Sequence, residues 1–199
     1  MEFIQALKSR HSEYQLSKNI GLSDDALLDF LKEILTYTPS AFNSQSQRIL
    51  VLMGQAHDRL WDELIDIMKG IVQADKFEKT KEKINGFKKA YGTILFFEDQ
   101  TVIEDLQERF PLYKDNFAKW SIEQNAMLQS NVWVGLKTKD IGASLQHYNE
   151  LIESFVIKHF DLPKSWALKS QMPFGHIDSY AEAKDHIDPS KRMMVKKTS

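Results

Sequence analysis

The chain has 199 residues, and its hydrophobic share (42%) and charged share (27%) are those of a folded globular protein, which predicts one domain over residues 1–199. The formal net charge of −2 excludes the diffuse basic field that drives nonspecific nucleic-acid binding. The absence of cysteine excludes disulfides, thiolate nucleophiles and thiolate metal sites, and fits a reducing compartment.

The N-terminal stretch MEFIQALKSRHSEYQ has no long apolar block, so we expect no secretory signal. No segment approaches the roughly 20 uninterrupted apolar residues that a bilayer span requires. These features predict a cytoplasmic protein without a nucleic-acid or membrane partner.

The first candidate site follows the amphipathic turn at the N-terminus, in the stretch SRHSEY. Arg10, His11 and Ser12 combine a guanidinium, an imidazole and a hydroxyl within three residues. A guanidinium suits phosphate bidentately, and a Ser hydroxyl can donate to the same anion. A polar helix end would have the same composition, so the residues alone leave both interpretations open. Lys191 and Arg192 are candidates for adding charge to the same anion.

A helix is predicted next, with Ser23 as its N-cap and Pro39 ending the apolar pattern. The polar stretch TPSAFNSQSQR, residues 38–48, follows it. If this stretch is extended, Asn43 and Gln45 point the same way and their amides match the edge of a heteroaromatic ring. The alternative is a turn rich in Ser and Asn between a helix and a strand.

Two continuous apolar runs, residues 48–54 and 92–99, predict strands buried on both faces of a central sheet. Helices are predicted between them, over residues 55–71 and 76–91. Beyond them, residues 116–142 form the longest helical pattern, in which Gly135 leaves room for another helix.

Residues 142–149 and 165–175 are weaker strand candidates. From residue 173 onward the chain is less hydrophobic and is predicted to be an extended arm with a basic tail. Because such an arm has little core of its own, it predicts packing against a partner subunit. The pattern as a whole indicates an α+β fold and an oligomer.

The common catalytic motifs are absent from the sequence. It contains no G-x-x-x-x-G-K-[ST] loop, no G-x-G-x-x-G motif and no G-x-S-x-G elbow. His147, Glu150 and Glu153 have a spacing that could present three metal ligands on one helix face, but a solvated helix start explains them better. We therefore predict no metal site. His57 and His159 are expected to be packing or surface residues.

Taken together, these segments resemble the nitroreductase family of FMN-dependent oxidoreductases. The order Arg-x-Ser, helix, Pro-Ser-x-x-Asn-x-Gln and apolar strand carries the resemblance. The phrases HSEYQLSKN, PSAFNSQSQR, YGTILFFEDQ, FPLYKDNFAKWSIEQNAM, GASLQHYN and QMPFG are similar to its fatty-acid-repression-mutant-like subgroup. The resemblance spans about residues 3–196. It implies a mostly antiparallel sheet flanked by helices, a domain-swapped C-terminal arm, and a homodimer with one FMN in each interface cleft.

The resemblance also implies roles for individual residues. Arg10, His11 and Ser12 would bind flavin and phosphate in one subunit, and a basic residue of the arm, Arg192 or Lys191, would reach the phosphate. The other subunit would supply Ser40, Asn43 and Gln45. Backbone near Gln146 and His147 would approach the redox-active nitrogen. The substrate cleft is predicted to include Phe42, Tyr14 and Trp120, although core packing is at least as good an interpretation of Trp120. Tyr14 stands where many members have a second basic residue.

The activity that the resemblance implies is ping-pong electron transfer. NADH or NADPH would reduce FMN and leave, and a nitroaromatic, quinone or related small-molecule acceptor would then take the electrons. The cofactor carries this chemistry, so no protein nucleophile or general base is required. The alternative is a non-catalytic flavin- or lipid-linked regulatory protein on the same scaffold.

Overall fold

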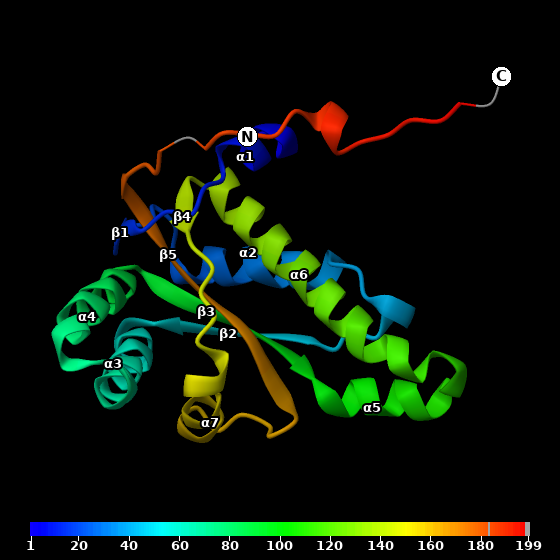
Figure 1. Ribbon diagram of the computed structural model, residues 1–199, viewed down its shortest axis with the longest axis horizontal. Coiled ribbons are helices and arrows are strands. Elements are labelled where there is room, and N and C mark those ends of the chain that lie inside the picture. Colours follow the sequence, from blue (N-terminus) through cyan, green and yellow to red (C-terminus); the bar gives the residue numbers. More distant parts are fainter. Residues whose placement is uncertain (183, 198–199) are drawn as a thin grey trace.

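The computed structural model describes residues 1–182 and 184–197, and Figure 1 shows its layers of helices around a sheet. Within these residues the sheet has five strands, and every pairing between strands is antiparallel. The strand order is β1 (Gln15–Ser17), β5 (Trp166–Ser179), β3 (Gly92–Asp99) and β2 (Gln47–Met53), and β4 (Ile141–Ala143) also pairs with β5. The predicted α+β fold with a mostly antiparallel sheet is confirmed.

Strand β3 lies at the centre of the core because its side chains are buried on both faces, as predicted. Ile94 and Phe96 point into one apolar cluster, and Leu95 and Phe97 point into the other. This alternation follows from the two-residue period of a strand. The sheet therefore separates two cores, each covered by its own helices.

The helices divide between the two faces of the sheet (Figure 1). Those over the Ile94 face are α2 (Asp24–Tyr37) and α6 (Lys114–Thr138), and α1 (Phe3–Ser9) contacts α6. Those over the Leu95 face are α3 (Gly54–Ile71), α4 (Ala74–Lys88) and α7 (Asn149–His159). α5 (Gln100–Arg109) packs on α6. Short 3-10 turns are η1 (Ala41–Asn43), η2 (Pro111–Tyr113) and η3 (Pro189–Lys191).

Two local predictions about helices are confirmed. The Ser23 hydroxyl accepts a hydrogen bond from the Ala26 amide (3.3 Å), which caps α2. Helix α2 crosses α6 closely at Gly135, where a Cβ would lie 2.7 Å from Cδ1 of Ile34. The sequence therefore identified both the start of α2 and the residue of α6 at which another helix packs closely.

Two predictions about elements need correction, and one helix was not predicted. The helix predicted over 76–91 ends at Lys88, because residues from Gly92 onward join the sheet. Strand β2 lies at one edge of the sheet, and most of its side chains are only partly buried. Of the two strands predicted to be buried on both faces, only β3 is. Helix α5 was not predicted. Asp99 caps it directly after β3, with its carboxylate accepting from the Thr101 amide (3.2 Å).

The C-terminal third also differs from the prediction. Of the strand expected over 142–149, only the first residues belong to β4. At Tyr148 and Asn149 the hydrogen bonds are made to the side chain of Gln171 and not to the backbone of a neighbouring strand. The arm begins later than residue 173, because Phe174 is fully buried and β5 continues to Ser179. Beyond it the segment passes over α1 (Figure 1). Of the basic tail predicted over 188–199, Thr198 and Ser199 lie outside the described residues, as does Ala183 of the arm.

Across the described ranges, none of the helices combines the length and the apolar character that crossing a bilayer would demand.

Candidate functional site

The segment after α1 is fixed by α6 and β4. The Arg10 guanidinium lies over the Trp133 ring, 4.2 Å from its centroid. The Trp133 indole N–H and the Glu13 amide both donate to the carbonyl of Ala143 (3.1 and 3.0 Å). Ser12 forms a parallel bridge with the same Ala143. These contacts set the position of the predicted Arg10–Ser12 segment.

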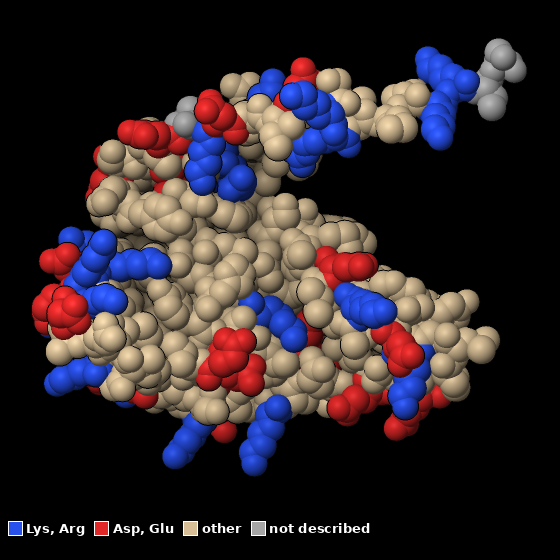
Figure 2. Space-filling model, viewed as in Figure 1, with Lys and Arg blue, Asp and Glu red and all other residues tan. Residues whose placement is uncertain are grey.

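Arg10 opens into a basic cavity of about 540 Å³. Partial burial lowers the pKa of the Arg10 guanidinium, although an arginine stays charged at neutral pH. A cation that has already given up part of its hydration favours an anionic ligand. The residues that line the cavity are Leu7, Lys8, Arg10, His11, Ser12, Lys184 and His186. Figure 2 shows Lys and Arg side chains gathered where the C-terminal segment passes α1.

The basic residues of the arm that line this cavity differ from the predicted ones. Lys184 and His186 line it, whereas Lys191 and Arg192 lie further along the arm and are exposed. Neither Lys184 nor His186 was among the predicted site residues. The lysine two positions before a histidine was the available signal.

The carboxylate of Glu13 ties the arm to this segment. Glu13 is buried, and its Oε2 accepts a hydrogen bond from the Ala181 amide (2.7 Å). Strand β1, which follows Glu13, pairs with the end of β5, which precedes Ala181. The two chain segments that line the basic cavity are therefore hydrogen-bonded side by side.

The loop with the predicted ring-edge amides is not extended. Phe42, Asn43 and Gln45 have φ values of 55°, 52° and 49°, in the left-handed region that side chains other than glycine rarely adopt. The premise that Asn43 and Gln45 share a face of an extended segment is therefore wrong. The Ser40 hydroxyl accepts from the Gln45 amide (2.9 Å), which is the Ser-rich turn considered as the alternative. Asn43 and Gln45 are nevertheless exposed.

Phe42 brings the predicted aromatic residues together. Its ring stacks on Trp120, with centroids 6.0 Å apart and planes at 24°. Phe110, Tyr113 and Phe117 surround the same ring at 5.0, 5.7 and 5.3 Å. A cavity of about 490 Å³ opens beside it, lined by Pro39, Ser40, Ala41, Phe42, Trp120, Glu123, Gln124 and Met127. Phe42, Trp120 and Ser40 thus meet, whereas Tyr14 lies beside β1 and does not line this cavity.

A buried polar network underlies the loop, and sequence reasoning did not assign it a role. Glu98, at the end of β3, accepts hydrogen bonds from Ser46 (2.5 Å), Gln124 (3.1 Å) and Asn125 (2.9 Å). Burial raises the pKa of the Glu98 carboxyl, and these three hydrogen bonds oppose that rise. The detectable signal was a Gln-Asn pair on a helix whose other buried side chains are mostly apolar.

The predicted positions at the end of β4 lie against β5. The backbone of Gln146 exchanges two hydrogen bonds with Gln171 (2.7 and 2.9 Å), and its side chain donates to Ser144 (3.1 Å). His147 beside it is exposed. Glu153 accepts from the Leu168 amide (2.6 Å), so it does not join His147 and Glu150. Within residues 1–182 and 184–197, no three His, Asp or Glu side chains are placed to hold a metal ion.

His57 is a core residue, as predicted. One ring nitrogen lies 2.9 Å from the Thr93 hydroxyl and the other lies 3.1 Å from the carbonyl of Lys88. Burial lowers the pKa of the His57 imidazole. Because a carbonyl can only accept, Nε2 carries the proton and Nδ1 accepts from Thr93. This histidine serves the core between α3 and β3.

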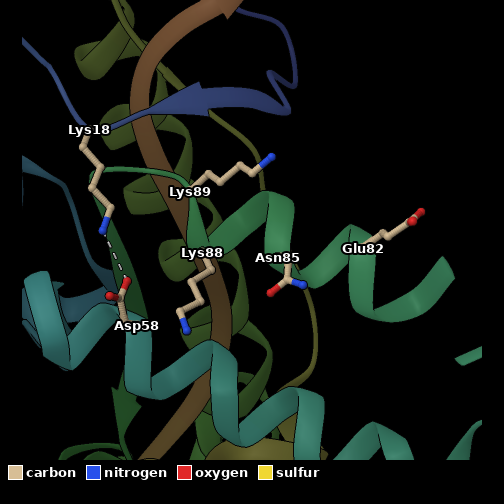
Figure 3. Close-up of a pocket in the computed structure, with 6 residues that line it drawn as sticks. All are labelled: Lys18, Asp58, Glu82, Asn85, Lys88 and Lys89. Atoms are coloured by element: carbon tan, nitrogen blue, oxygen red, sulfur yellow. Dashed lines mark ion pairs between the residues drawn. The ribbon is translucent and has the colours of Figure 1, made fainter. Parts of the chain in front are cut away.

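A further concavity, of about 600 Å³, lies between β1, α3 and α4 (Figure 3). It is lined by Lys18, Asp58, Glu82, Asn85, Lys88 and Lys89. Lys18 lies 3.5 Å from Asp58, and Lys88 pairs with Asp62 at 2.6 Å. Figure 3 shows Lys89 and Glu82 pointing away from the others. Neutralised and diverging side chains make this a poor ligand site.

The comparison with known proteins decides the family. A family model described as the nitroreductase family matches residues 7–176. This chain belongs to the nitroreductase family. The yeast nitroreductase FRM2 from Saccharomyces cerevisiae is 30% identical over 188 residues, covering 94% of this chain and 93% of the yeast protein. The predicted likeness to the fatty-acid-repression-mutant subgroup is confirmed.

Solved structures agree with that assignment. Nitroreductase CinD from Lactococcus lactis in complex with nicotinic acid has a TM-score of 0.92 and 43% identity, covering 98% of this chain and 100% of that chain. CinD structures with chloramphenicol and 4-nitrophenol are 42% identical, with TM-scores of 0.90 and 0.87 and the same coverage. A nitroreductase from Desulfitobacterium hafniense with bound FMN shares the fold at a TM-score of 0.72 and 16% identity, covering 98% and 100% of the two chains. FMN is thus bound in structures of this family, and membership supports a flavin oxidoreductase.

In this nitroreductase six of the predicted site residues line two cavities that have no lining residue in common, and the other predicted residues line neither. One contains Arg10, His11 and Ser12, and the other contains Ser40, Phe42 and Trp120. The first cavity offers charge for an anion, and the second offers aromatic surface beside exposed amides. These properties fit the two ends of FMN: the basic cavity suits its phosphate, and the aromatic cavity suits its fused ring.

Proposed function

We propose that this nitroreductase is an FMN-dependent oxidoreductase that takes electrons from NADH or NADPH and passes them to nitroaromatic, quinone or related acceptors in ping-pong order. The observation that supports the proposal is the presence, in one chain, of a basic cavity at Arg10 and an aromatic cavity at Phe42. CinD, 43% identical, supports the choice of ligands, because its structures hold nicotinic acid and 4-nitrophenol.

When bound, FMN supplies the redox chemistry, and the chain's own residues bind and orient the reactants. Arg10, Ser12 and the arm residues Lys184 and His186 hold the phosphate; His11, Lys191 and Arg192 remain candidates for this contact. Charge-assisted hydrogen bonds to phosphate are about twice as strong as neutral ones, and the planar guanidinium of Arg10 can make two of them at once.

The amide side chains of Asn43 and Gln45, with the Ser40 hydroxyl, bind the polar edge of the flavin ring. Gln146 and His147 lie along the same cofactor. Phe42 and Trp120 form an apolar wall that excludes water and stacks on a planar acceptor. No protein nucleophile is required, and solvent at the open cavity supplies protons.

We propose further that the protein is a homodimer whose C-terminal arms are exchanged. The arm exposes Met193, Met194 and Val195, at 67%, 84% and 64% of their surface. Figure 2 shows this segment extending away from the body of the molecule. Burying these side chains against a partner removes apolar surface from water. The second subunit would bring the Ser40–Gln45 loop to the Arg10 cavity, so that both halves act on one FMN.

The test uses purified protein loaded with FMN. Under anaerobic conditions, NADH or NADPH should bleach the flavin absorbance, and 4-nitrophenol should restore it. Initial rates with both substrates varied should give parallel double-reciprocal lines. Protein that takes up no FMN contradicts the proposal. Protein that holds FMN but is not reduced by either nicotinamide indicates the non-catalytic regulatory alternative.

Sedimentation tests the dimer separately. Removing residues 191–199 deletes the exposed apolar side chains but retains Lys184 and His186. We expect this truncation to shift the protein from dimer toward monomer, and full-length protein that sediments as a monomer contradicts the exchanged arm.

A further inference from the structure

The loop that carries Phe42, Asn43 and Gln45 adopts a backbone that its sequence does not favour. Left-handed φ values at three of four consecutive residues, one of them aromatic, persist only where surrounding contacts impose them. The loop contains no glycine to ease them. Something adjacent must therefore hold it.

The side chain of Gln124, on α6, supplies that contact. Its Oε1 accepts hydrogen bonds from the Ala41 amide (3.0 Å) and the Ser44 hydroxyl (3.4 Å), on either side of Phe42. Its Nε2 donates the other way, to the hydroxyl of Ser46 (2.6 Å) and to Glu98 (3.1 Å). Gln124 is almost fully buried, so water cannot replace these contacts easily.

Glu98 decides which end of the Gln124 amide faces the loop. The carboxyl oxygens of Glu98 accept all three of its hydrogen bonds, from Gln124, Ser46 and Asn125, and the amide nitrogen is the only part of Gln124 that can donate to them. The amide nitrogen of Gln124 must therefore point to Glu98, and its oxygen must point to the loop. With the amide reversed, an N–H group would face the N–H of Ala41.

We propose that Glu98 is a positioning residue for the flavin: through Gln124 it imposes the left-handed loop and so places Phe42, Asn43 and Gln45 at the ring. Glu98 is fully buried and lines neither cavity, so it acts on ligands only through other residues. The link to flavin rests on the proposed function, but the link to the loop is a property of the chain alone.

The network allows a test by exchanging its two central groups. In E98Q, one amide N–H faces another donor, Gln124 or Asn125, in either orientation of the introduced side chain. Q124E places two carboxylates together. In the double variant E98Q/Q124E, the amide introduced at position 98 accepts from Asn125 and donates to the carboxylate introduced at position 124. That carboxylate accepts from Ala41, Ser44 and Ser46, so every group again has a partner.

The first measurement needs no flavin. Hydrogen exchange reports on the loop through the amides of Ala41 and Gln45, which donate to Gln124 and Ser40. We expect E98Q to raise both exchange rates by about tenfold, the effect of one unsatisfied buried group, and the double variant to restore them to within about threefold. Exchange that stays at the wild-type rate in E98Q, or is not restored in the double variant, overturns the proposal. So does exchange that rises equally at the amides of α7, which would indicate a general loss of stability.

The second measurement is the FMN dissociation constant. It should rise by about tenfold in E98Q and recover in the double variant, in parallel with the exchange rates. A constant unchanged in E98Q overturns the positioning role. If wild-type protein binds no FMN, the proposed function fails, while the exchange data still decide whether Glu98 holds the loop.

E153Q is the matched control. Glu153 also accepts a backbone hydrogen bond through a carboxyl oxygen, from the Leu168 amide, but it lies on α7. The E153Q substitution should raise the exchange rate of the Leu168 amide. It should leave the exchange rates of Ala41 and Gln45, and the FMN dissociation constant, unchanged. S46A provides a milder variant if E98Q does not fold. It removes one hydroxyl from the network and should give a smaller rise at the same two amides, and no rise there contradicts the proposal.

Discussion

The guanidinium of Arg10 lies 4.2 Å from the centroid of the Trp133 ring, so a residue of the N-terminal segment is held by the C-terminal part of α6. A cation over an indole face is attracted by the ring, the more so when it is partly desolvated. The stack orients the guanidinium toward the basic cavity while the Trp133 N–H anchors β4.

Replacing Arg10 with Ala should weaken FMN retention, because each charge-assisted hydrogen bond that the substitution removes is worth about 1.5–3 kcal/mol. W133L should weaken it less, since the charge remains but nothing orients it. Equilibrium titration with FMN measures both.

R59A is the control for Arg10. Arg59 lies 5.0 Å from the Phe155 ring and pairs with Glu63, on the opposite side of the sheet from α6. Its replacement removes an arginine from an aromatic face without touching the basic cavity. An FMN constant that changes as much in R59A as in R10A would contradict the placement of the phosphate.

Phe42 should govern the acceptor more than the cofactor. F42A removes the ring that stacks on Trp120 and opens the aromatic cavity. We expect KM for 4-nitrophenol to rise several-fold, since an aromatic pair contributes about 0.5–1.5 kcal/mol. KM for the nicotinamide donor should change in the same direction, because both reactants use the cleft in ping-pong order. Unchanged KM values would remove Phe42 from the cleft.

G135A should destabilise the protein, although Ala is the better helix former. The added Cβ would lie 2.7 Å from Ile34 Cδ1, and overpacking of this kind costs about 1–3 kcal/mol, more than the roughly 1 kcal/mol gained in helix propensity. Adding I34V removes Cδ1 and should recover part of the stability, as measured by urea unfolding.

Gly86 provides the comparison for Gly135. It lies in α4, and a Cβ there would meet nothing within 4 Å. G86A should therefore stabilise the protein by about 0.5–1 kcal/mol. Substitutions at both glycines that shift stability in the same direction would show that the contact with α2 is not the cause.

His57 predicts a pH dependence of stability. Its pKa is lowered by burial in the folded state, so below about pH 6.5 the unfolded chain binds more protons than the native one. The stability that the neutral His57 contributes is therefore fully present above its pKa in the unfolded chain. It is lost as the pH falls toward its pKa in the folded protein. As the pH is lowered from about 7.5 to about 5, the free energy of unfolding should decrease more steeply for wild type than for H57Q.

The sequence predicted those parts of the fold in which local pattern and packing agree. Strand β3 reads as a buried strand because its residues are apolar on both faces, and Ser23 caps α2 through a contact only three residues long. Strand β2 was misjudged because an apolar run does not distinguish a central strand from an edge strand whose side chains are only partly covered.

The site was harder to predict for a physical reason. Asn43 and Gln45 were predicted as site residues, but their backbone conformation depends on a contact with Gln124, which is distant in the chain. Local propensity cannot report a left-handed loop imposed by tertiary contacts. Lys184 was missed similarly, because its place beside Arg10 depends on how β5 ends.

The hydrogen bond between Glu13 and Ala181 has a consequence for the order of assembly. It joins segments separated by nearly the whole chain, and such pairings are closed late because a long loop must first be ordered. The cavity that gathers Arg10, Lys184 and His186 therefore does not exist on a growing polypeptide. It forms only once residues 181, 184 and 186 have folded back onto the N-terminal segment, so an anion can bind there only after these distant parts of the chain have met.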